Sequence, residues 1–269
     1  MNLVFAKNRN RMSYIAASVL AVLTLATLAF GSPAASRPGR NVNPGIIRFH
    51  AHPYGSTYGE WSGAWWSWAI GIPAATNPIL DETGEFGDIN QQGPVFFLAG
   101  SFGTTVERTL TIPHGKGLFF PIVNSLWWLP DDLGFAEFYV EVILGLDLGD
   151  FTDIELIRLV ANEHQDFDEL EMTLTIDGVE QSDLEQYYTD SPAFVVPDTA
   201  FFDDLGGIMD EDNLSVSAGR WIMLAPLSAG AHTIRFTVDA DDDFFGSFAL
   251  DVTYNLTVQP PGPSMGATR

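Results

Sequence analysis

The sequence predicts a mainly β protein: an antiparallel β-sandwich with one or two helices packed at its N-terminal side. Three observations support this fold class. Apolar and polar residues alternate along several short segments, tight-turn sequences separate those segments, and no regular alternation of strands and helices indicates a parallel sheet. We expect a signal peptide at 1–34, a linker or edge strand at 35–53, one domain at 54–258 with helical insertions, and a flexible tail at 259–269.

The C-terminal segments show the strand pattern most clearly. Apolar residues occupy alternate positions from His232 to Val238 and again from Phe248 to Val258, on either side of an acidic turn. This pattern predicts an antiparallel hairpin with one buried face. Shorter alternating segments lie at 105–112, with Val106, Leu110 and Ile112 in one row, and at 170–176. Asp177-Gly178 follows the second of these and is typical of a tight turn.

Two capping boxes predict helices. Thr57 and Glu60 precede a segment in which Trp61, Trp65, Trp68 and Ile72 share one face, and Pro73 ends it. Thr152 and Glu155 open a second helix of about three turns, whose apolar stripe includes Ile154, Ile157 and Ala161. The segment GFAEFYVEVILGL between the two fits either a helix or a strand.

Composition excludes several function classes. The 269 residues are 46% hydrophobic, enough for a substantial core, so a wholly disordered chain is excluded. Because 12 Lys and Arg face 35 Asp and Glu, the net charge is −23, and we expect no nucleic-acid partner and no binding to an anionic membrane. The absence of cysteine excludes a disulfide framework, a thiolate metal site and a cysteine nucleophile.

The N-terminus has the features of a secretory signal. Lys7, Arg9 and Arg11 precede an uncharged run from Ile15 to Phe30, and Ser32-Pro33-Ala34 then supplies small residues for cleavage. A retained membrane anchor is the alternative, but the run is shorter than the ~20 residues that span a bilayer. We therefore expect a secreted protein, extracellular or periplasmic, that does not bind a membrane after cleavage.

Three motifs resemble those of a family of bacterial secreted proteins with no assigned function. They are YGEWSGAWWSWAIGIPAATNPILD, GPVFFLAG and IPHGKGLFFPIVN, with a weaker similarity over 226–236. The resemblance implies secretion and a shared domain, but no chemistry. In that family one Cys lies near the position of Gly87 and another at that of Leu110, and both are absent here. If the two are bonded in relatives, these two segments lie side by side.

A few polar residues stand out within the apolar motifs. Lys116 lies between Gly115 and Gly117, and the large excess of acids leads us to expect that it pairs with Glu60 or Asp81. Such a pair fits a catalytic cleft or a buried structural ion pair. The structural interpretation is favoured because no second catalytic carboxylate stands at a defined spacing.

The tryptophans suggest carbohydrate binding, since flat aromatic faces stack on sugar rings. Trp66 falls off the predicted apolar stripe and Trp127-Trp128 precede Pro130, so these three are the better candidates for exposure, but a packing role for all the tryptophans is favoured. The candidate binding cluster is Glu60, Trp66, Asn77, Asp81, Lys116, Asn124, Trp127 and Trp128.

Two segments have metal-ligand spacing. Asp239, Asp241 and Asp243 match the first positions of a calcium loop, but Phe244 replaces its glycine and Leu250 its last glutamate, so it is not an EF-hand. A calcium site shared with Asp210 or Asp212 and a solvated acidic turn both remain open, and we expect the solvated turn. His50 and His52 would share one face of a strand and chelate a transition metal; two surface histidines are the default.

Two function classes remain. One is a secreted, non-catalytic β-sandwich module that binds a glycan, an ion or an extracellular protein. The other is an extracellular hydrolase whose site lies where the Trp-rich helix meets the Lys116 turn. We favour the module because the sequence has no recognisable nucleophile, metal cluster or cofactor motif, and Ca²⁺ is the one cofactor considered. Catalytic residues, ligand and oligomeric state are not specified by the sequence.

Overall fold

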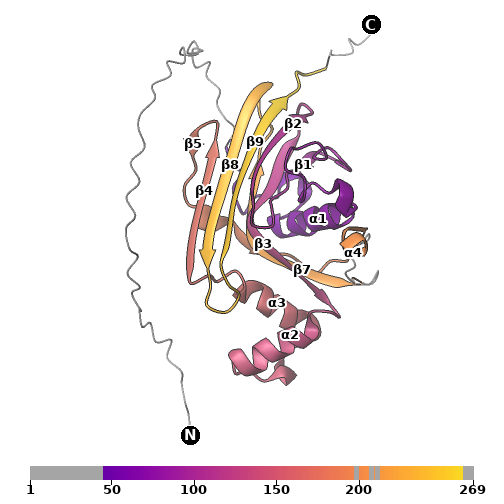
Figure 1. Cartoon of the computed structure of the whole chain (residues 1–269), viewed down its shortest axis with the longest axis vertical. Coiled ribbons are helices and arrows are strands. Elements are labelled where there is room, and N and C mark those ends of the chain that lie inside the picture. Colours follow the sequence, from indigo (N-terminus) through magenta and orange to yellow (C-terminus); the bar gives the residue numbers. More distant parts are fainter. Residues whose placement is uncertain (1–44, 197–199, 206–208, 210–212, 263–269) are drawn as a thin grey trace, which may run out of the picture. The chain divides into compact units, whose positions relative to one another are not determined.

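Two β-sheets pack face to face and enclose the main core (Figure 1). The computed structural model describes residues 45–196, 200–205, 209 and 213–262. The four-stranded sheet has the order β1 (Val95–Phe97), β3 (Gly117–Leu129), β7 (Leu214–Leu224), β6 (Tyr188–Asp190). The five-stranded sheet has the order β2 (Thr105–Ile112), β9 (Phe248–Val258), β8 (Gly230–Asp241), β4 (Glu169–Ile176), β5 (Val179–Glu180). The predicted mainly β sandwich is confirmed.

The described helices are short. The α-helices are α1 (Tyr58–Ile70), α2 (Leu133–Phe138), α3 (Asp153–Glu163) and α4 (Ala200–Leu205). A π-helical turn, η3 (Tyr139–Ile143), continues α2. Single 3₁₀ turns are η1 (Pro53–Gly55), η2 (Ala74–Thr76), η4 (Leu148–Asp150) and η5 (Leu184–Tyr187).

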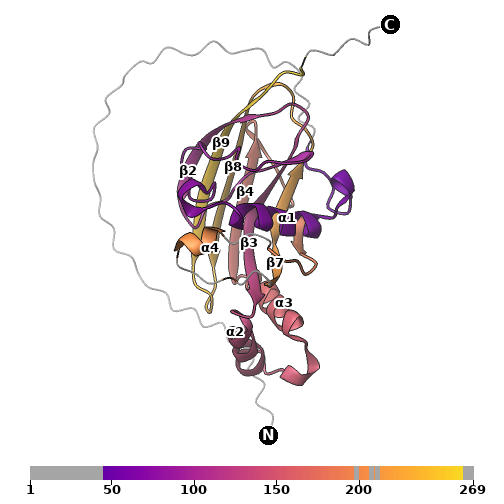
Figure 2. The same cartoon turned by 90° about the vertical axis from the view of Figure 1, so that its right-hand side faces the viewer.

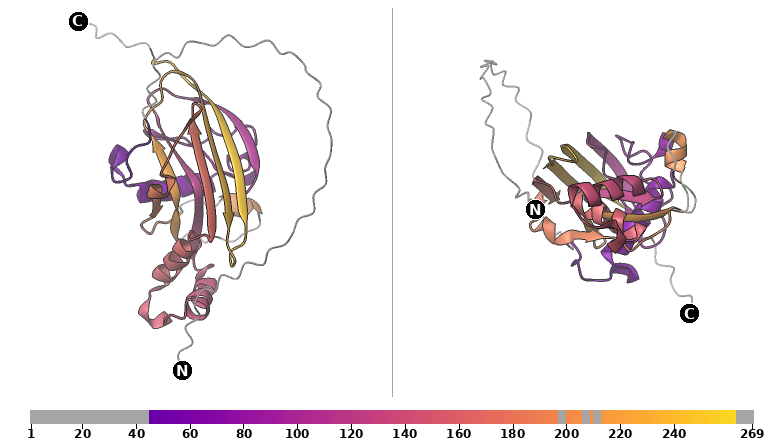
Figure 3. Two further views of the ribbon diagram at one scale, coloured as in Figure 1. Left: turned by 90° about the vertical axis from the view of Figure 1, so that its left-hand side faces the viewer. Right: turned by 90° about the horizontal axis from the view of Figure 1, so that it is seen from below.

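The strands of the five-stranded sheet follow the alternation in the sequence. β8 and β9 pair antiparallel along their length, with Phe236 opposite Val252, as the C-terminal pattern predicts. Asp177 and Gly178, with φ of 52° and 76°, form the two-residue turn between β4 and β5. The outer face of this sheet carries none of the described helices (Figure 3), so every second residue of its strands points to solvent.

Two strand pairs are parallel, which the antiparallel prediction does not include. β1 pairs with β3, and β2 pairs with β9, both in parallel. The reason is the path of the chain: after β1 it leaves the four-stranded sheet and enters the five-stranded one as β2. Such crossings depend on contacts between distant segments, and hydrophobic periodicity contains no information about them.

Aromatic side chains pack on both faces of the four-stranded sheet. Between the sheets, Phe120 stacks on Phe236 with ring centroids 5.4 Å apart. On the outer face, which α1 covers (Figure 2), Phe119 stacks on Trp221 at 5.2 Å and Trp65 meets the Trp221 ring edge-on at 5.5 Å. The sheet is therefore buried on both sides, and β7 reads as one nearly continuous buried run.

Helix α1 begins at the predicted capping box, in which the Thr57 and Glu60 side chains each bond to the backbone of the other. It is covered on more than one side. A Cβ added to Gly59 would come 2.5 Å from the carbonyl oxygen of Asp190, so the glycine permits the segment after β6 to lie directly against the helix. Trp66 is only 7% exposed for this reason, which agrees with the favoured packing role and not with its candidate exposure.

The ambiguous segment GFAEFYVEVILGL is helical, and it forms α2 and η3. Together with α3, which begins at its predicted capping box, it builds a second, smaller core against one end of β3 and β7 (Figure 1). The fully buried members of this second core are Ala136, Tyr139, Val140, Leu156, Ile157, Val160, Ala161, Val216 and Ala218.

The N-terminal predictions fall mostly outside the described residues. The signal peptide (1–34), residues 35–44 and the tail from 263 onward are not part of them. Where an edge strand was expected, Ile46 forms a single bridge with Leu224 and the Ile47 amide donates to the Met223 carbonyl at 2.8 Å. Among the described helices, none is both long and apolar enough to cross a bilayer.

Gly87 and Leu110 lie in contact, although 22 positions separate them. A Cβ on Gly87 would come 2.4 Å from Cδ2 of Leu110. The expected adjacency of these two segments is thus confirmed. Gly87 has no positive φ, so the leucine side chain is what excludes a larger residue there.

We predict that Gly87→Cys combined with Leu110→Cys forms a disulfide in oxidising medium, because the shorter cysteine side chain frees the space that leucine fills. The oxidised variant should be more stable than its reduced form by about 3 kcal/mol, since the bond closes a loop of moderate length. Intact mass would show the loss of two hydrogens, and urea unfolding would measure the stability. Each single variant serves as the control, and a double variant that stays reduced would contradict the contact.

Candidate functional site

The structure divides the candidate binding cluster into two groups. Trp66, Asn124, Trp127 and Trp128 line one groove beside β3. Glu60, Asn77, Asp81 and Lys116 lie elsewhere, and each has a structural partner of its own.

The expected ion pair of Lys116 is absent, and the prediction is wrong. Lys116 is half-buried at the turn before β3, where its ammonium contacts the carbonyl oxygen of Gly93. Glu60 uses its carboxylate to cap α1 and is exposed. A long side chain at a glycine-rich turn reaches solvent easily, so no buried partner is required.

The buried cation is Arg108 instead. It lies between Val106 and Leu110 in the β2 row that also holds Ile112, and it is 1% exposed. Its guanidinium donates to the carbonyls of Asp81 (2.6 Å), Ile79 (3.1 Å), Ala99 (2.8 Å) and Gly100 (2.9 Å), and to the Tyr254 hydroxyl (2.8 Å). Among the described residues it forms no ion pair, so neutral oxygens alone solvate the charge.

Asn77 and Asp81 organise the loop that Arg108 binds. The Asn77 amide donates to the carbonyls of Ala69 and Ile72, both at 2.7 Å, and so ties the loop to the end of α1. The Asp81 carboxylate accepts from the amides of Thr83 and Phe86. Burial alone would raise the pKa of Asp81, but these hydrogen bonds outweigh it and lower the pKa. Both residues are structural.

The groove, with a volume of about 380 Å³, lies along β3 where that strand has no neighbour on the side opposite β7. β1 pairs with β3 only as far as Phe119, and no other described strand continues on that side. The groove is lined by Trp66, Ile70, Phe102, Asn124, Ser125, Leu126, Trp127, Trp128, Asp132, His164, Phe201 and Phe202. We call this the aromatic groove.

Paired rings form its walls. Phe102 stacks on Phe201 of α4 at 6.1 Å, and Trp128 packs against Phe202 at 5.0 Å. Trp127 meets His164, at the end of α3, edge-on at 5.7 Å. Phe102 is exposed, and Trp127 and Trp128, the candidates for exposure, are half-buried. A flat ligand therefore has several apolar surfaces to contact.

Polar atoms without partners gather at this groove. Seven buried side-chain nitrogen or oxygen atoms of the described residues have no hydrogen-bond partner, and five belong to residues that line it. The five are Trp66 Nε1, Asn124 Nδ2, Ser125 Oγ, Trp127 Nε1 and His164 Nδ1. Three of these can only donate. Each unpaired buried group costs about 1–3 kcal/mol, so a molecule whose acceptor oxygens reach these atoms after a side-chain shift gains their pairing.

Asp132 is the carboxylic acid of the lining. Its Oδ2 accepts from the Trp128 amide at 2.8 Å. Burial, with a smaller contribution from the neighbouring charge of Asp131, raises the pKa of Asp132 to about 6 against that hydrogen bond. Burial also lowers the pKa of His164, so at neutral pH the groove holds a carboxylate and an uncharged imidazole.

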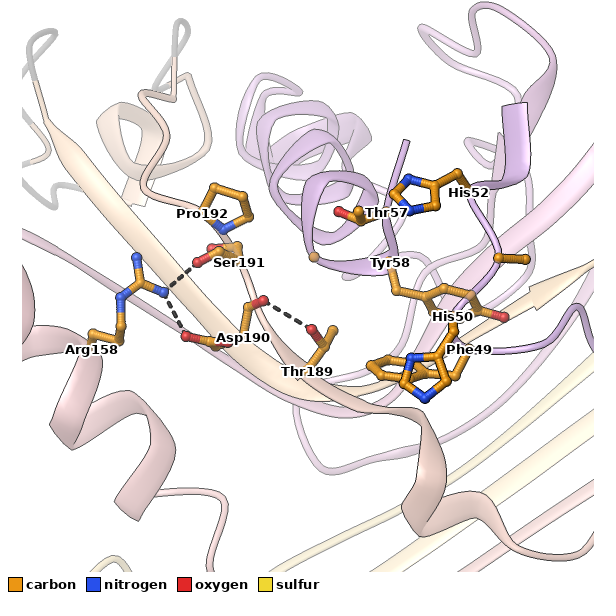
Figure 4. A pocket seen from close by; sticks show the side chains of 12 residues that line it. Phe49, His50, His52, Thr57, Tyr58, Arg158, Thr189, Asp190, Ser191 and Pro192 are labelled. Atoms are coloured by element: carbon orange, nitrogen blue, oxygen red, sulfur yellow. Dashed lines mark hydrogen bonds and ion pairs between the residues drawn. The ribbon is translucent and has the colours of Figure 1, made fainter. Parts of the chain in front are cut away.

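A second cavity, of about 540 Å³, lies at the other side of α1 and is shown in Figure 4. Arg158 donates to the Asp190 carboxylate at 2.6 Å and contacts the Ser191 carbonyl, while His50 and His52 lie across the cavity from it. The charged groups that line it are thus paired, and no unpartnered buried atom of the described residues belongs to its lining. We call it the basin.

The metal-ligand predictions find no cluster to support them. His50 and His52 lie in a turn before η1, so the prediction that they share a strand face is wrong. Asp239 and Asp241 are on β8, where the Asp241 carboxylate accepts from Ser247 at 2.5 Å. In the described part of the chain, no three His, Asp or Glu side chains come close enough to share an ion. Asp210 and Asp212 lie outside the described residues.

Several groove residues were not predicted from the sequence. Asp132 lies two positions after Pro130 and four after Trp128, and that proximity was a usable signal. Ser125, between Asn124 and Leu126, was another. His164, Phe201 and Phe202 come from helices far along the chain, and no local pattern could have associated them with β3.

Comparisons with known proteins add no functional information. No protein-family model and no curated protein matches the chain. A solved structure, "Solution Structure of Amebosin", aligns with 58% of this chain and 97% of its own length, at 10% identity and a TM-score of 0.15. A similarity that low supports no statement about fold or function.

We predict that Arg108→Met destabilises the fold by at least about 4 kcal/mol, because it leaves four buried carbonyls without a donor. Lys116→Met is the matched control and should change the free energy of unfolding by less than about 0.5 kcal/mol. Urea unfolding measures both. A melting temperature of Arg108→Met within two or three degrees of wild type would contradict the assigned network.

The raised pKa of Asp132 predicts a pH dependence. Between the ordinary value near 3.8 and about 6, the folded state binds more protons than the unfolded state, so stability falls as pH rises. Because the carboxyl is partly solvated, we expect a loss of about 1–2 kcal/mol rather than the full shift. Asp132→Asn keeps an acceptor for Trp128 and should remove this part of the pH profile, while Asp131→Asn should leave most of it.

Proposed function

We propose that the chain is a secreted β-sandwich module that binds a carbohydrate in the aromatic groove. The observation that supports this most is the gathering of unpaired buried polar atoms on an aromatic lining. Sugar rings present flat C–H faces for aromatic contact and hydroxyl and ring oxygens for donors. The groove offers both kinds of partner in one place.

The basin supports a binding function less well. Arg158 in its lining forms an ion pair with Asp190, and other polar groups around the cavity are already paired. A ligand there would have to break existing hydrogen bonds before it made new ones, which costs free energy. The aromatic groove requires no such exchange.

A hydrolase is the second candidate, supported by the raised pKa of Asp132. A carboxylic acid with a pKa of about 6 in an aromatic cleft is suited to protonate a leaving group. Glycoside hydrolysis ordinarily needs a second carboxyl group across the cleft. Asp132 is the one carboxyl group among the described lining residues, so we place binding first. The alternative site at Lys116 has no support, because Lys116 and Glu60 do not meet.

The test is binding to a glycan array, followed by titration with soluble hexasaccharides of glucose, xylose and N-acetylglucosamine, monitored by tryptophan fluorescence. We predict that Trp128→Ala and Phe202→Ala each weaken binding of the selected glycan at least tenfold, and that Trp127→Phe, which removes a single N–H donor, weakens it about fivefold to tenfold.

Phe49→Ala is the matched control, because it removes an aromatic ring from the basin and leaves the groove intact. Its affinity should equal that of wild type. No glycan bound on the array, or equal losses in the groove and basin variants, would contradict the proposal. Release of reducing ends by wild type but not by Asp132→Asn would favour the hydrolase instead.

A further inference from the structure

The helical segment formed by α2 and η3 is apolar on two adjoining faces. Ala136, Tyr139 and Val140 are buried against α3 in the smaller core. Phe135, Phe138 and Val142, spaced by three and four residues, lie on a different face and are 38%, 48% and 59% exposed. An amphipathic surface helix would carry polar residues there, so this face has the composition of a buried one.

This exposed face continues into neighbouring segments. It is extended by Ile143, the last residue of η3, and by Leu146 beyond it. Phe244 from the β8–β9 turn also belongs to it, with its ring 4.9 Å from that of Tyr139. We call Phe135, Phe138, Val142, Ile143, Leu146 and Phe244 the apolar tip. They are six of the eleven large apolar side chains that are exposed among the described residues. The tip lies at the end of the sandwich that α2 and α3 occupy (Figures 1 and 3). A concentration of this kind marks an interaction surface.

The charge around the tip restricts the partner. No Lys or Arg occurs from residue 117 to 157. The exposed acids of this stretch are Asp131, Glu137, Glu141, Asp147, Asp150, Asp153 and Glu155. An anionic lipid surface would be repelled, and a second copy of the chain would bring two acidic rims together. A partner with an apolar face and a cationic border fits both properties.

We propose that the apolar tip docks a helix of another protein, whose apolar stripe is flanked by Lys or Arg. Phe135, Phe138 and Val142 form a ridge on α2 and η3. Their three- and four-residue spacing is that by which one helix packs into the grooves of another. The π-helical turn η3 begins directly after Phe138 and includes Val142. Such turns are often found at functional sites. This site is separate from the aromatic groove and does not depend on the proposed carbohydrate.

The experiment measures binding of a fluorescein-labelled amphipathic peptide of Leu and Lys to the exported chain by anisotropy. A Leu/Glu peptide of the same pattern and a scrambled Leu/Lys peptide are the probe controls. We expect micromolar affinity for the helical Leu/Lys peptide, at least tenfold loss in Phe138→Ser with Val142→Ser, and at least threefold loss in Glu137→Gln with Glu141→Gln. These side chains are exposed, so circular dichroism and melting temperature should match wild type.

Matched variants separate the tip from the bulk charge of the chain. Val179→Ser with Val195→Ser removes equally exposed apolar groups elsewhere, and Glu171→Gln with Glu180→Gln removes equal charge. Both should bind as wild type does. Equal losses in these controls would overturn the proposal. So would tip-dependent binding to phosphatidylcholine vesicles, or a tip-dependent dimer in sedimentation velocity, since either would identify a different occupant.

Discussion

The fold depends on how one buried charge is solvated. Arg108 has five hydrogen bonds from its guanidinium to neutral oxygens, and these come from three separate segments of the chain. Two acceptors, Ala99 and Gly100, lie where the chain leaves β1 and crosses to the other sheet. Because a buried cation without partners costs many kcal/mol, the crossing, the Asn77–Gly87 loop and β9 must remain together for the protein to stay folded.

That crossing also creates the aromatic groove. β1 is only three residues long and ends where the chain turns toward Arg108, so β3 beyond Phe119 pairs with β7 but has no strand on its other side. In a longer β1, backbone pairing would cover Asn124 and Leu126. Instead the open edge is flanked by Phe102 from the crossing and by rings from α4, and the side chains of β3 there are left with fewer polar partners. The site is thus a consequence of how the two sheets are connected.

The sequence predicts the elements of this fold well and their long-range associations poorly. Alternation identifies β2, β4, β8 and β9, and the capping boxes identify α1 and α3, because both signals depend on neighbouring residues. Arg108 shows the limit. It lies in an apolar row whose period is correct, yet a single charged residue in such a row gives no indication of which carbonyls will surround it. Lys116 was predicted to form a buried ion pair because of its two glycine neighbours. Those glycines form a turn, but a turn does not bury the lysine.

The candidate site shows the same division. Trp127, Trp128 and Asn124 were predicted as binding residues and do meet in one groove, whereas Trp66 joins them by being buried rather than exposed. Asp132 and His164 complete the chemistry, and they come from the start of α2 and the end of α3. The packing of the smaller core positions both residues beside β3. Its members are spread over about eighty residues of sequence, and they fit together by shape and volume, which no local motif encodes.

Trp127 connects the two surfaces of the molecule. One of its neighbours is His164 in the aromatic groove, at 5.7 Å, and another is Phe135 on the apolar tip, stacked at 5.5 Å. Because side chains in a packed cluster cannot shift singly without leaving voids, a displacement of α2 must move Trp127 or open a gap beside it. The shape of the groove and the position of α2 are therefore physically linked through one indole ring. A substitution that enlarges the space under Phe135 acts on both surfaces, whereas one at the outer edge of the ridge, such as Val142, acts on the tip alone.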